Sequence, residues 1–311
     1  QLRRPLAQVL SIPEVPAPEL CTLKGTHNIV VTGVGGTGVV TIGALLAMAA
    51  HLDGKAAGVM EMAGLAQKGG AVHIHCRIGE TPEDISAVRV ALGECDALIG
   101  GDLVVSAQGN TLGLMAPTGG AVVNRHEIIT GEFTRDTGFA IPGADLHLAL
   151  TARLHERARL FNATLLAETA LGDTVYANMI LLGAAYQQGL LPLTQEALLE
   201  AIALNGVKVT QNQQAFALGR WAMVDADLEM KFARAEAPVQ DPEAARLAGL
   251  HAYGTGRLLR YEAMRSKLAG VEAGLLEVAL QSYHKLLCYK DEYEVARLLL
   301  ATKTQVAERF E

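Results

Sequence analysis

The chain has 311 residues, of which 50% are hydrophobic and 19% charged, and its formal net charge is −7 at pH 7. This length and apolar content exclude an intrinsically disordered chain and leave room for one large domain or two smaller ones. The acidic balance argues against a nucleic-acid partner, which needs a basic surface, and the longest apolar run, Val39–Ala50, is shorter than the roughly 20 residues that cross a membrane.

Residues 1–25 are expected to form an arm without regular structure. Prolines interrupt any helix or strand there, at Pro5, Pro13, Pro16 and Pro18. Little apolar periodicity remains between them, so we expect this stretch to act as a linker.

The first strand ends in a glycine turn that opens a helix. An apolar run reaches about Thr32 and is followed by residues with the G-x-G-x-x-G spacing, which comprise Gly33, Gly35, Gly36, Thr37 and Gly38. The helix over 37–51 is apolar nearly all round, so we expect it to be buried between a sheet and another layer or subunit. Free N–H groups at such a helix N-terminus can hold a phosphate group, although the same turn also makes a tight, close-packed crossover.

Two more strands flank a second glycine-bearing segment. The first is expected over 55–62 and the second over 71–78, where apolar and polar residues alternate strictly, as in a half-buried strand. Residues 63–70 show neither helical nor strand periodicity and are predicted to be a loop.

This loop and the strand behind it are a candidate anion-binding surface. The residues that could contribute are Lys68, Gly69, Gly70 and Arg77. Cationic side chains and bare backbone amides together attract anions. The alternatives are a plain polar strand face toward solvent and a metal site at His73 and His75, for which no carboxylate or cysteine completes a ligand set.

The rest of the chain completes an α/β domain and then becomes helical. Short strands are expected at 97–100 and 121–124, and Asp102 is placed to cap the helix after the first of them. Helices are expected over 174–189, 195–204 and 207–221, the first of them amphipathic. Asp241-Pro242-Glu243 has the pattern of a helix start.

Short strands that alternate with helices indicate a three-layer α/β/α Rossmann-like domain with a mainly parallel sheet, followed by an all-α segment. Acidic residues and a proline interrupt the pattern between the two. The predicted parts are an arm over 1–25, the α/β domain over 26–225, a linker over 226–240, and an incomplete helical segment over 241–311.

A nicotinamide site is one interpretation of the glycine turn. A dinucleotide fold places an acid at the end of its second strand, about 20 residues on, to bond the ribose. Glu61 stands 23 positions after Gly38, but the segment 61–70 is a glycine-bearing loop rather than the usual crossover. A self-sufficient NAD(P)-dependent dehydrogenase therefore stays an alternative, as does a structural interface module that binds no small molecule.

The chain shows no redox motif of its own. Its four cysteines are scattered without a C-x-x-C pair, which argues against an iron–sulfur cluster or a cysteine zinc site and fits a reducing cytoplasm. The Gly-Asp pairs at 101–102 and 172–173 do not continue into the Gly-Asp-Gly pattern of thiamine diphosphate sites. We therefore expect a cytoplasmic chain with no metal site and no catalytic residue.

Three segments form an ordered set, namely Gly33–Gly38, Gly64–Val72 with His75 and Arg77, and Asp96–Asp102. Their order and spacing resemble the gamma domain of 2-oxoacid:ferredoxin oxidoreductases, especially the indolepyruvate branch, to which Ala201–Val207 is also similar. Lys285–Arg297 resembles the helical domain that follows gamma in long fused bacterial forms. The resemblance covers about 25–225 well and 241–311 in part.

The resemblance implies a part of a larger oxidoreductase that acts on the oxo group of a 2-oxoacid, here indolepyruvate or another arylpyruvate, with an iron–sulfur protein as acceptor. Members of the family use coenzyme A, thiamine diphosphate and 4Fe–4S clusters, and pass electrons to ferredoxin. The thiamine-binding and iron–sulfur domains would then be partners outside this chain, within an oligomer, and the chain alone would be inactive. The resemblance also implies a coenzyme A site here, with the pyrophosphate at Gly35–Gly38 and other phosphates at Lys68 and Arg77.

Overall fold

The computed structural model describes residues 11–35, 37–63, 70–128, 142–233, 241–288, 295–296 and 300. They fall into two compact units, an α/β unit that ends at residue 233 and a helical unit that begins at residue 241. Within these described residues, no helix is both long and apolar enough to cross a membrane.

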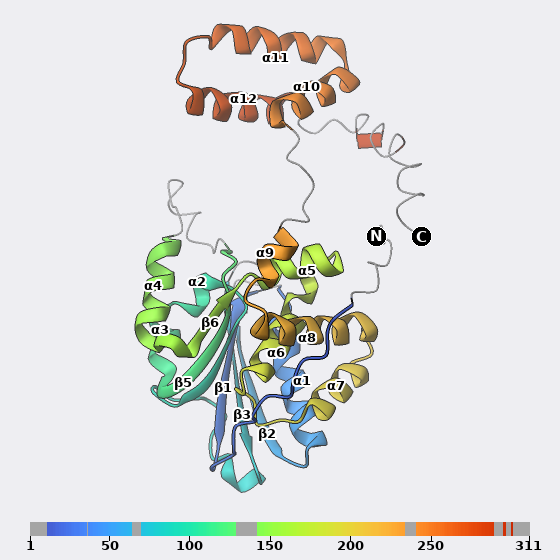
Figure 1. The fold of residues 1–311 in the computed structure, drawn as a ribbon. Coiled ribbons are helices and arrows are strands. Elements are labelled where there is room, and N and C mark those ends of the chain that lie inside the picture. The colour runs from blue at the N-terminus through green and yellow to red at the C-terminus, as the bar shows by residue number, and fades with distance from the viewer. Residues whose placement is uncertain are drawn as a thin grey trace. The chain divides into compact units, whose positions relative to one another are not determined.

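The α/β unit is built on one sheet of six strands in the order β2-β3-β1-β4-β5-β6 (Figure 1). The strands are β1 (His27–Val34), β2 (Ala56–Ala63), β3 (Ala71–Gly79), β4 (Cys95–Gly100), β5 (Met115–Asn124) and β6 (Ala158–Phe161). The strands β1, β4, β5 and β6 pair in parallel, whereas β3 is antiparallel to both of its neighbours. The predicted mainly parallel sheet is confirmed, and β6 is a strand that the sequence analysis missed.

Helices cover both faces of this sheet. One face carries α1 (Val39–Leu52), α5 (Ala163–Leu171), α6 (Ala177–Gln187), α7 (Gln195–Leu204), α8 (Val209–Val224) and α9 (Leu228–Ala233). The other carries α2 (Leu103–Ser106), α3 (Gly109–Leu114) and α4 (Gly143–Leu154). Short 3-10 turns are η1 (Pro82–Asp84), η3 (His155–Arg157) and η4 (Thr174–Tyr176).

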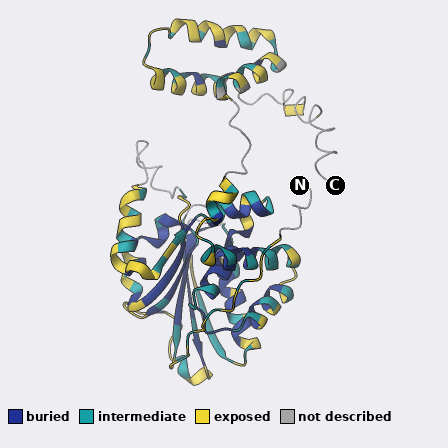
Figure 2. Cartoon of the chain, viewed as in Figure 1, coloured by how far each residue is buried: buried dark blue, intermediate teal, exposed yellow. Residues whose placement is uncertain are grey.

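The sheet separates two hydrophobic cores, because successive side chains of a strand point to opposite faces. Ile29 and Val31 of β1 belong to the core with α1 and α6, and Val30 belongs to the core with α2 and α4. Figure 2 shows most of the strands as buried, with exposed residues on the outer sides of the flanking helices. The predicted three-layer α/β/α architecture is confirmed.

The prediction of an amphipathic helix over 174–189 is wrong in one respect. Every residue of α6 from Ala177 to Tyr186 is buried, so the helix has no solvent-facing side. It lies between the sheet and α8, and two glycines allow this close approach. A Cβ on Gly183 would overlap the carbonyl group of Phe216, and one on Gly219 would overlap that of Ile180.

Part of the predicted linker is a helix of the α/β unit. Residues 228–233 form α9, in which Leu228 is buried in the main core and Phe232 packs against that core. Glu229 accepts a hydrogen bond from the backbone N–H of Asn162 at 2.9 Å. The acidic residues around Leu228 led to the prediction of a linker. Leu228 and Phe232 lie one helical turn apart, however, and both contact the core.

The N-terminal arm has no helix or strand over residues 11–25, as predicted, yet it is attached to the domain. Arg220 of α8 is buried and donates to the carbonyl oxygens of Val15 and Pro16 at 3.0 and 3.1 Å. Its guanidinium also lies 5.4 Å from the centre of the Tyr186 ring. The described part of the arm therefore belongs to the fold.

The polar side of β3 is covered rather than exposed. His75 is only 2% exposed, and its Nδ1 accepts a hydrogen bond from the Val90 N–H at 3.0 Å. Burial, with the nearby charges of His73 and Arg89, lowers the pKa of His75 to about 4. The alternative of a plain polar face toward solvent is therefore wrong at this position.

The helical unit consists of α10 (Pro242–Tyr253), α11 (Thr255–Lys267) and α12 (Ala273–Leu287). Its small core contains Leu250, Tyr261, Leu280 and Leu287. Asp241 caps α10 by accepting from the Glu243 N–H at 3.0 Å, so the predicted helix start is confirmed. No strand occurs among its described residues, in agreement with the predicted all-α segment.

The glycines at the crossing of α6 and α8 give a stability prediction. Gly183→Ala should lower the free energy of unfolding by about 3 kcal/mol, because its methyl group would displace the α8 backbone. Gly113→Ala in α3 is the matched control, since its nearest neighbour, Leu92 Cδ2, would lie at an ordinary 3.5 Å. Urea unfolding of the two variants measures the difference, and equal midpoints would contradict the close packing.

Candidate functional site

The candidate site lies where β1 and β4 end side by side. The chain leaves β1 through α1 on one face of the sheet, and it leaves β4 through α2 on the other face (Figure 1). The two parallel strands thus send their connections in opposite directions, and their carboxyl ends form a topological switch point. Open α/β sheets bind ligands outside the carboxyl ends of strands at such a point.

The N-terminus of α1 points its backbone N–H groups into this region. Gly38 precedes the helix with φ +81°, a left-handed conformation that favours glycine. No side chain caps the helix and no acid lies in its first turn, all of whose residues the structure describes. The first N–H groups of a helix lack intrahelical acceptors and carry the positive end of its dipole, so they favour an anion.

Glycines also let α1 approach the ends of both strands. A Cβ on Gly33 would lie 2.5 Å from Val39 Cγ1, and one on Gly101 would lie 2.9 Å from the same atom. Gly101 further donates its N–H to the Thr32 carbonyl oxygen at 2.7 Å. These glycines are therefore required for packing, whatever the turn binds.

Hydrogen bonds from three directions hold the turn in place. Gly35 donates its N–H to the Gly70 carbonyl oxygen at 2.8 Å, and the Thr37 hydroxyl donates to the Val34 carbonyl oxygen at 2.7 Å. Asn178 of α6 donates through Nδ2 to the Thr37 carbonyl oxygen at 2.6 Å. No local signal in the sequence indicates this role of Asn178, because the contact joins segments 141 positions apart.

The structure brings some of the predicted site residues together. Gly33, Gly35, Thr37 and Gly38 lie in one turn, and Gly70 is bonded to it at the start of β3. The other predicted members, Gly36, Lys68 and Gly69, lie outside the described residues.

Arg77 does not lie beside the glycine turn. It pairs with Asn28 at the start of β1, whereas Ala71 pairs with Val34 at the end of that strand. Six residues of strand separate the two positions, which corresponds to about 20 Å. Arg77 instead donates to the Ala87 carbonyl oxygen at 3.0 Å and lies 3.7 Å from the Glu94 carboxylate.

Asp102 at the end of β4 caps α2, as predicted from the sequence. Its Oδ1 accepts from the Val105 N–H at 2.8 Å, but its buried Oδ2 has no hydrogen-bond partner among the described residues. The residue is 0% exposed. Burial raises the pKa of Asp102 to about 6, although the N–H groups of Val105 and Val104 favour the charged form.

Other polar side chains link the ends of neighbouring strands. Asn124 at the end of β5 donates to the Gly101 carbonyl oxygen at 3.1 Å and to the Thr164 hydroxyl at 2.8 Å. The hydroxyl groups of Thr32 and Ser106 lie 2.9 Å apart. The sequence signal for this role of Asn124 is a single polar residue after an apolar run. Such residues are more often only cap or turn residues.

The position of Glu61 argues against a nicotinamide site of the usual kind. Glu61 is exposed near the end of β2, and β3 lies between β2 and β1. Two strand spacings, or about 10 Å, therefore separate β2 from the strand that carries the glycine turn. A dinucleotide fold instead places the acid-bearing strand directly beside the first strand.

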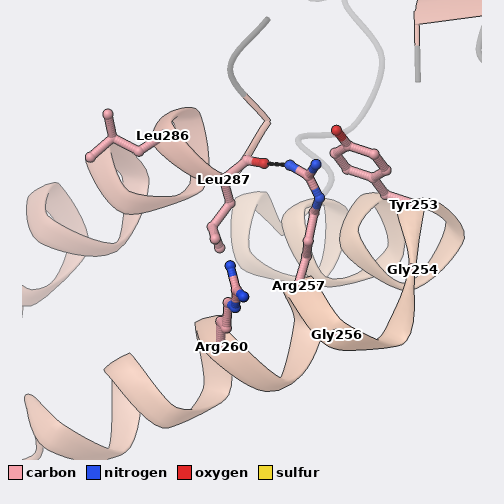
Figure 3. A pocket seen from close by; sticks show the side chains of 7 residues that line it. All are labelled: Tyr253, Gly254, Gly256, Arg257, Arg260, Leu286 and Leu287. Carbon is pink, nitrogen blue, oxygen red and sulfur yellow. Dashed lines mark hydrogen bonds between the residues drawn. The ribbon is translucent and has the colours of Figure 1, made fainter. Parts of the chain in front are cut away.

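A hollow of about 460 Å³ in the helical unit is a different kind of feature (Figure 3). Arg257 donates there to the carbonyl oxygen of Leu287 and lies 3.9 Å from the centre of the Tyr253 ring. Arg260 extends toward Leu287 beside it (Figure 3). These contacts tie the start of α11 to the ends of α10 and α12, which is a structural role.

Comparison with known proteins places the chain in a family. Residues 28–222 match the family described as "Pyruvate ferredoxin/flavodoxin oxidoreductase". Residues 247–311 match a second family, described as "Family of unknown function (DUF6537)". The first match spans more than half of the chain.

The relatives are subunits of oxidoreductases. Indolepyruvate oxidoreductase subunit IorB of Archaeoglobus fulgidus is 31% identical over 180 residues, which are 56% of this chain and 83% of the relative. The IorB subunit of Thermococcus kodakarensis is 28% identical over 195 residues, 62% of this chain and 94% of that one. The gamma subunit of a keto/oxoacid ferredoxin oxidoreductase from Geobacter sulfurreducens aligns with a TM-score of 0.45 and 23% identity, over 64% of this chain and 98% of the subunit.

These findings confirm the resemblance that the ordered motifs indicated. The sequence relatives are subunits of indolepyruvate oxidoreductases, and the family they share with this chain is that of pyruvate ferredoxin/flavodoxin oxidoreductases. The chain belongs to the pyruvate ferredoxin/flavodoxin oxidoreductase family, and it is homologous to the IorB subunit of indolepyruvate oxidoreductases.

Proposed function

We propose that residues 26–225 act as the gamma-type domain of a cytoplasmic 2-oxoacid:ferredoxin oxidoreductase whose substrate is indolepyruvate or another arylpyruvate. The observation that carries this proposal is the similarity to IorB subunits, which extends over most of their length. The helical segment that begins near residue 241 accompanies this domain as a separate unit.

The redox chemistry of this enzyme would belong to other domains or subunits. The scattered cysteines and the lack of a thiamine motif in the chain support this division. Thiamine diphosphate and 4Fe–4S clusters in those partners would supply the decarboxylation and the path of electrons to ferredoxin. The domain described here would bind a substrate group and contact the partners.

The glycine turn suits a phosphate group of coenzyme A. Its support is the uncapped N-terminus of α1, the lack of an acid in the first turn of that helix, and the hydrogen bonds that fix the turn before any ligand binds. Lys68 and Gly69 directly precede Gly70, which is bonded to the turn, so their position in the sequence supports a second contact. Arg77 lies too far along β3 to join this site.

Asp102 does not join the phosphate site. Its side chain caps α2, on the opposite face of the sheet from α1, and its second oxygen has no partner among the described residues. Because the residue is 0% exposed, no bound molecule reaches that oxygen, and we assign Asp102 to the cap of α2 rather than to binding.

Titration calorimetry of the chain tests the coenzyme A site, with NADH as the comparison ligand. We expect heat of binding for coenzyme A and none for NADH at the same concentration, because Glu61 lies two strands from the turn. Lys68→Gln should weaken coenzyme A binding by about tenfold, since a charged hydrogen bond is lost. Arg77→Gln, the matched control, should change it less than twofold.

Binding of NADH alone would favour the dehydrogenase alternative, and binding of neither ligand would favour an interface module. Equal loss of coenzyme A affinity in Lys68→Gln and Arg77→Gln would contradict the location of the site at the glycine turn.

The raised pKa of Asp102 gives a second prediction. Because burial raises this pKa from 3.8 to about 6, the folded state favours the protonated carboxyl. Its contribution to stability is then fully present below pH 3.8 and lost as the pH rises through about 6. Asp102→Asn keeps an oxygen to cap α2 and removes the charge, so it should raise the free energy of unfolding at pH 8 by up to about 3 kcal/mol.

Urea unfolding at pH 8 and pH 4 measures this difference, which should shrink at the lower pH. A variant less stable than the parent at pH 8 would contradict an unpaired, buried carboxylate.

A further inference from the structure

The outer edge of the sheet at β2 is unprotected. No strand of the described residues pairs with that edge, which is eight residues long. Its sequence, Ala-Ala-Gly-Val-Met-Glu-Met-Ala, holds no proline or lysine and only one charge, at Glu61. Natural edge strands usually carry charges, prolines or bulges that prevent pairing with another chain.

An apolar stripe on α1 is also exposed. Val40 and Met48 are each 42% exposed and Leu52 is 41% exposed, and Ala44 lies between the first two at helical spacing. The opposite side of the same helix is buried, so the expected burial on most sides of this helix is met on one side only.

The stripe and the edge form one surface. On the sheet side of α1, a Cβ on Gly43 would lie 3.5 Å from Val59 Cγ1 of β2. Ile42 and Ala44 flank Gly43 at about 100° on either side of the helix. Ile42 is buried and Ala44 is exposed, so the stripe lies on the outer side of α1, next to the edge strand β2. Glu61 shares the sheet face of Val59, because side chains two residues apart in a strand point the same way.

We propose that a second copy of this chain covers this surface through a two-fold axis. Two β2 strands would pair antiparallel and join the two sheets, and two α1 helices would pack antiparallel beside them. Val40 would then face Leu52 of the second copy, and Ala44 would face its Met48. Each pair joins exposed apolar side chains of complementary size.

The polar side chains at the two ends of the surface fit this symmetry. His51, which is exposed, lies near the end of α1, and Glu61, also exposed, lies near the end of β2. Helix and strand run in opposite directions, so the two residues lie at opposite ends of the surface. A two-fold axis between them would bring His51 of each copy to Glu61 of the other. An imidazole can donate a hydrogen bond to a carboxylate, so the two ends of the surface are complementary to each other.

Sedimentation velocity of the chain tests the proposal, and we expect twice the mass of one chain at micromolar concentration. Met48→Glu should raise the dissociation constant by about 100-fold, because it places a charge in an apolar interface. Leu148→Glu in α4 is the control, since Leu148 is 65% exposed but far from β2 in the sheet order. It should leave the mass unchanged.

Changes of charge at His51 and Glu61, at the two ends of the surface, test the antiparallel arrangement without placing a charge in the apolar stripe. His51→Glu should weaken the dimer at pH 7, and His51→Glu combined with Glu61→Lys should restore it. Thermal unfolding followed by circular dichroism checks that each variant is folded. A parent chain that is monomeric on its own would overturn the proposal. This outcome includes the case in which only a different subunit covers the surface. Equal effects of Met48→Glu and Leu148→Glu would overturn it too.

Discussion

The close approach of α1 to the ends of β1 and β4 is the constraint on which the rest of the α/β unit depends. It requires glycine at positions 33 and 101, where a side chain would meet Val39. The approach places the N-terminus of a half-buried helix directly outside the sheet, and it fixes the glycine turn before any ligand arrives. A packing requirement has thus created an anion-binding geometry at the switch point.

The glycine turn and Asp102 differ in how fully their polar groups are hydrogen-bonded. The turn is well satisfied by hydrogen bonds, which makes it a preorganised site. Asp102 instead carries an orphaned oxygen in a buried position, where a carboxylate at neutral pH destabilises the fold. The hydrogen bond that its other oxygen accepts from the Val105 N–H caps α2 and offsets part of this cost.

Much of this arrangement could be predicted from the sequence, because local signals determine it. The strand–glycine–helix unit, the cap at Asp102 and the start of α10 each lie within a few residues of their signal. The buried state of His75, the distance of Arg77 from the turn and the bond from Asn178 to Thr37 depend on strand order and on contacts between distant segments. Periodicity reports which face of a strand a residue occupies, but not what covers that face.

The most direct test of the account is reconstitution of the oxidoreductase with and without this chain. The full assembly, with its thiamine-binding and iron–sulfur parts, would be assayed for viologen reduction that depends on indolepyruvate and coenzyme A. We expect activity to be lost when the chain is omitted and to return when it is added back. Activity that is unchanged without the chain would contradict its assignment as the gamma-type part of the enzyme.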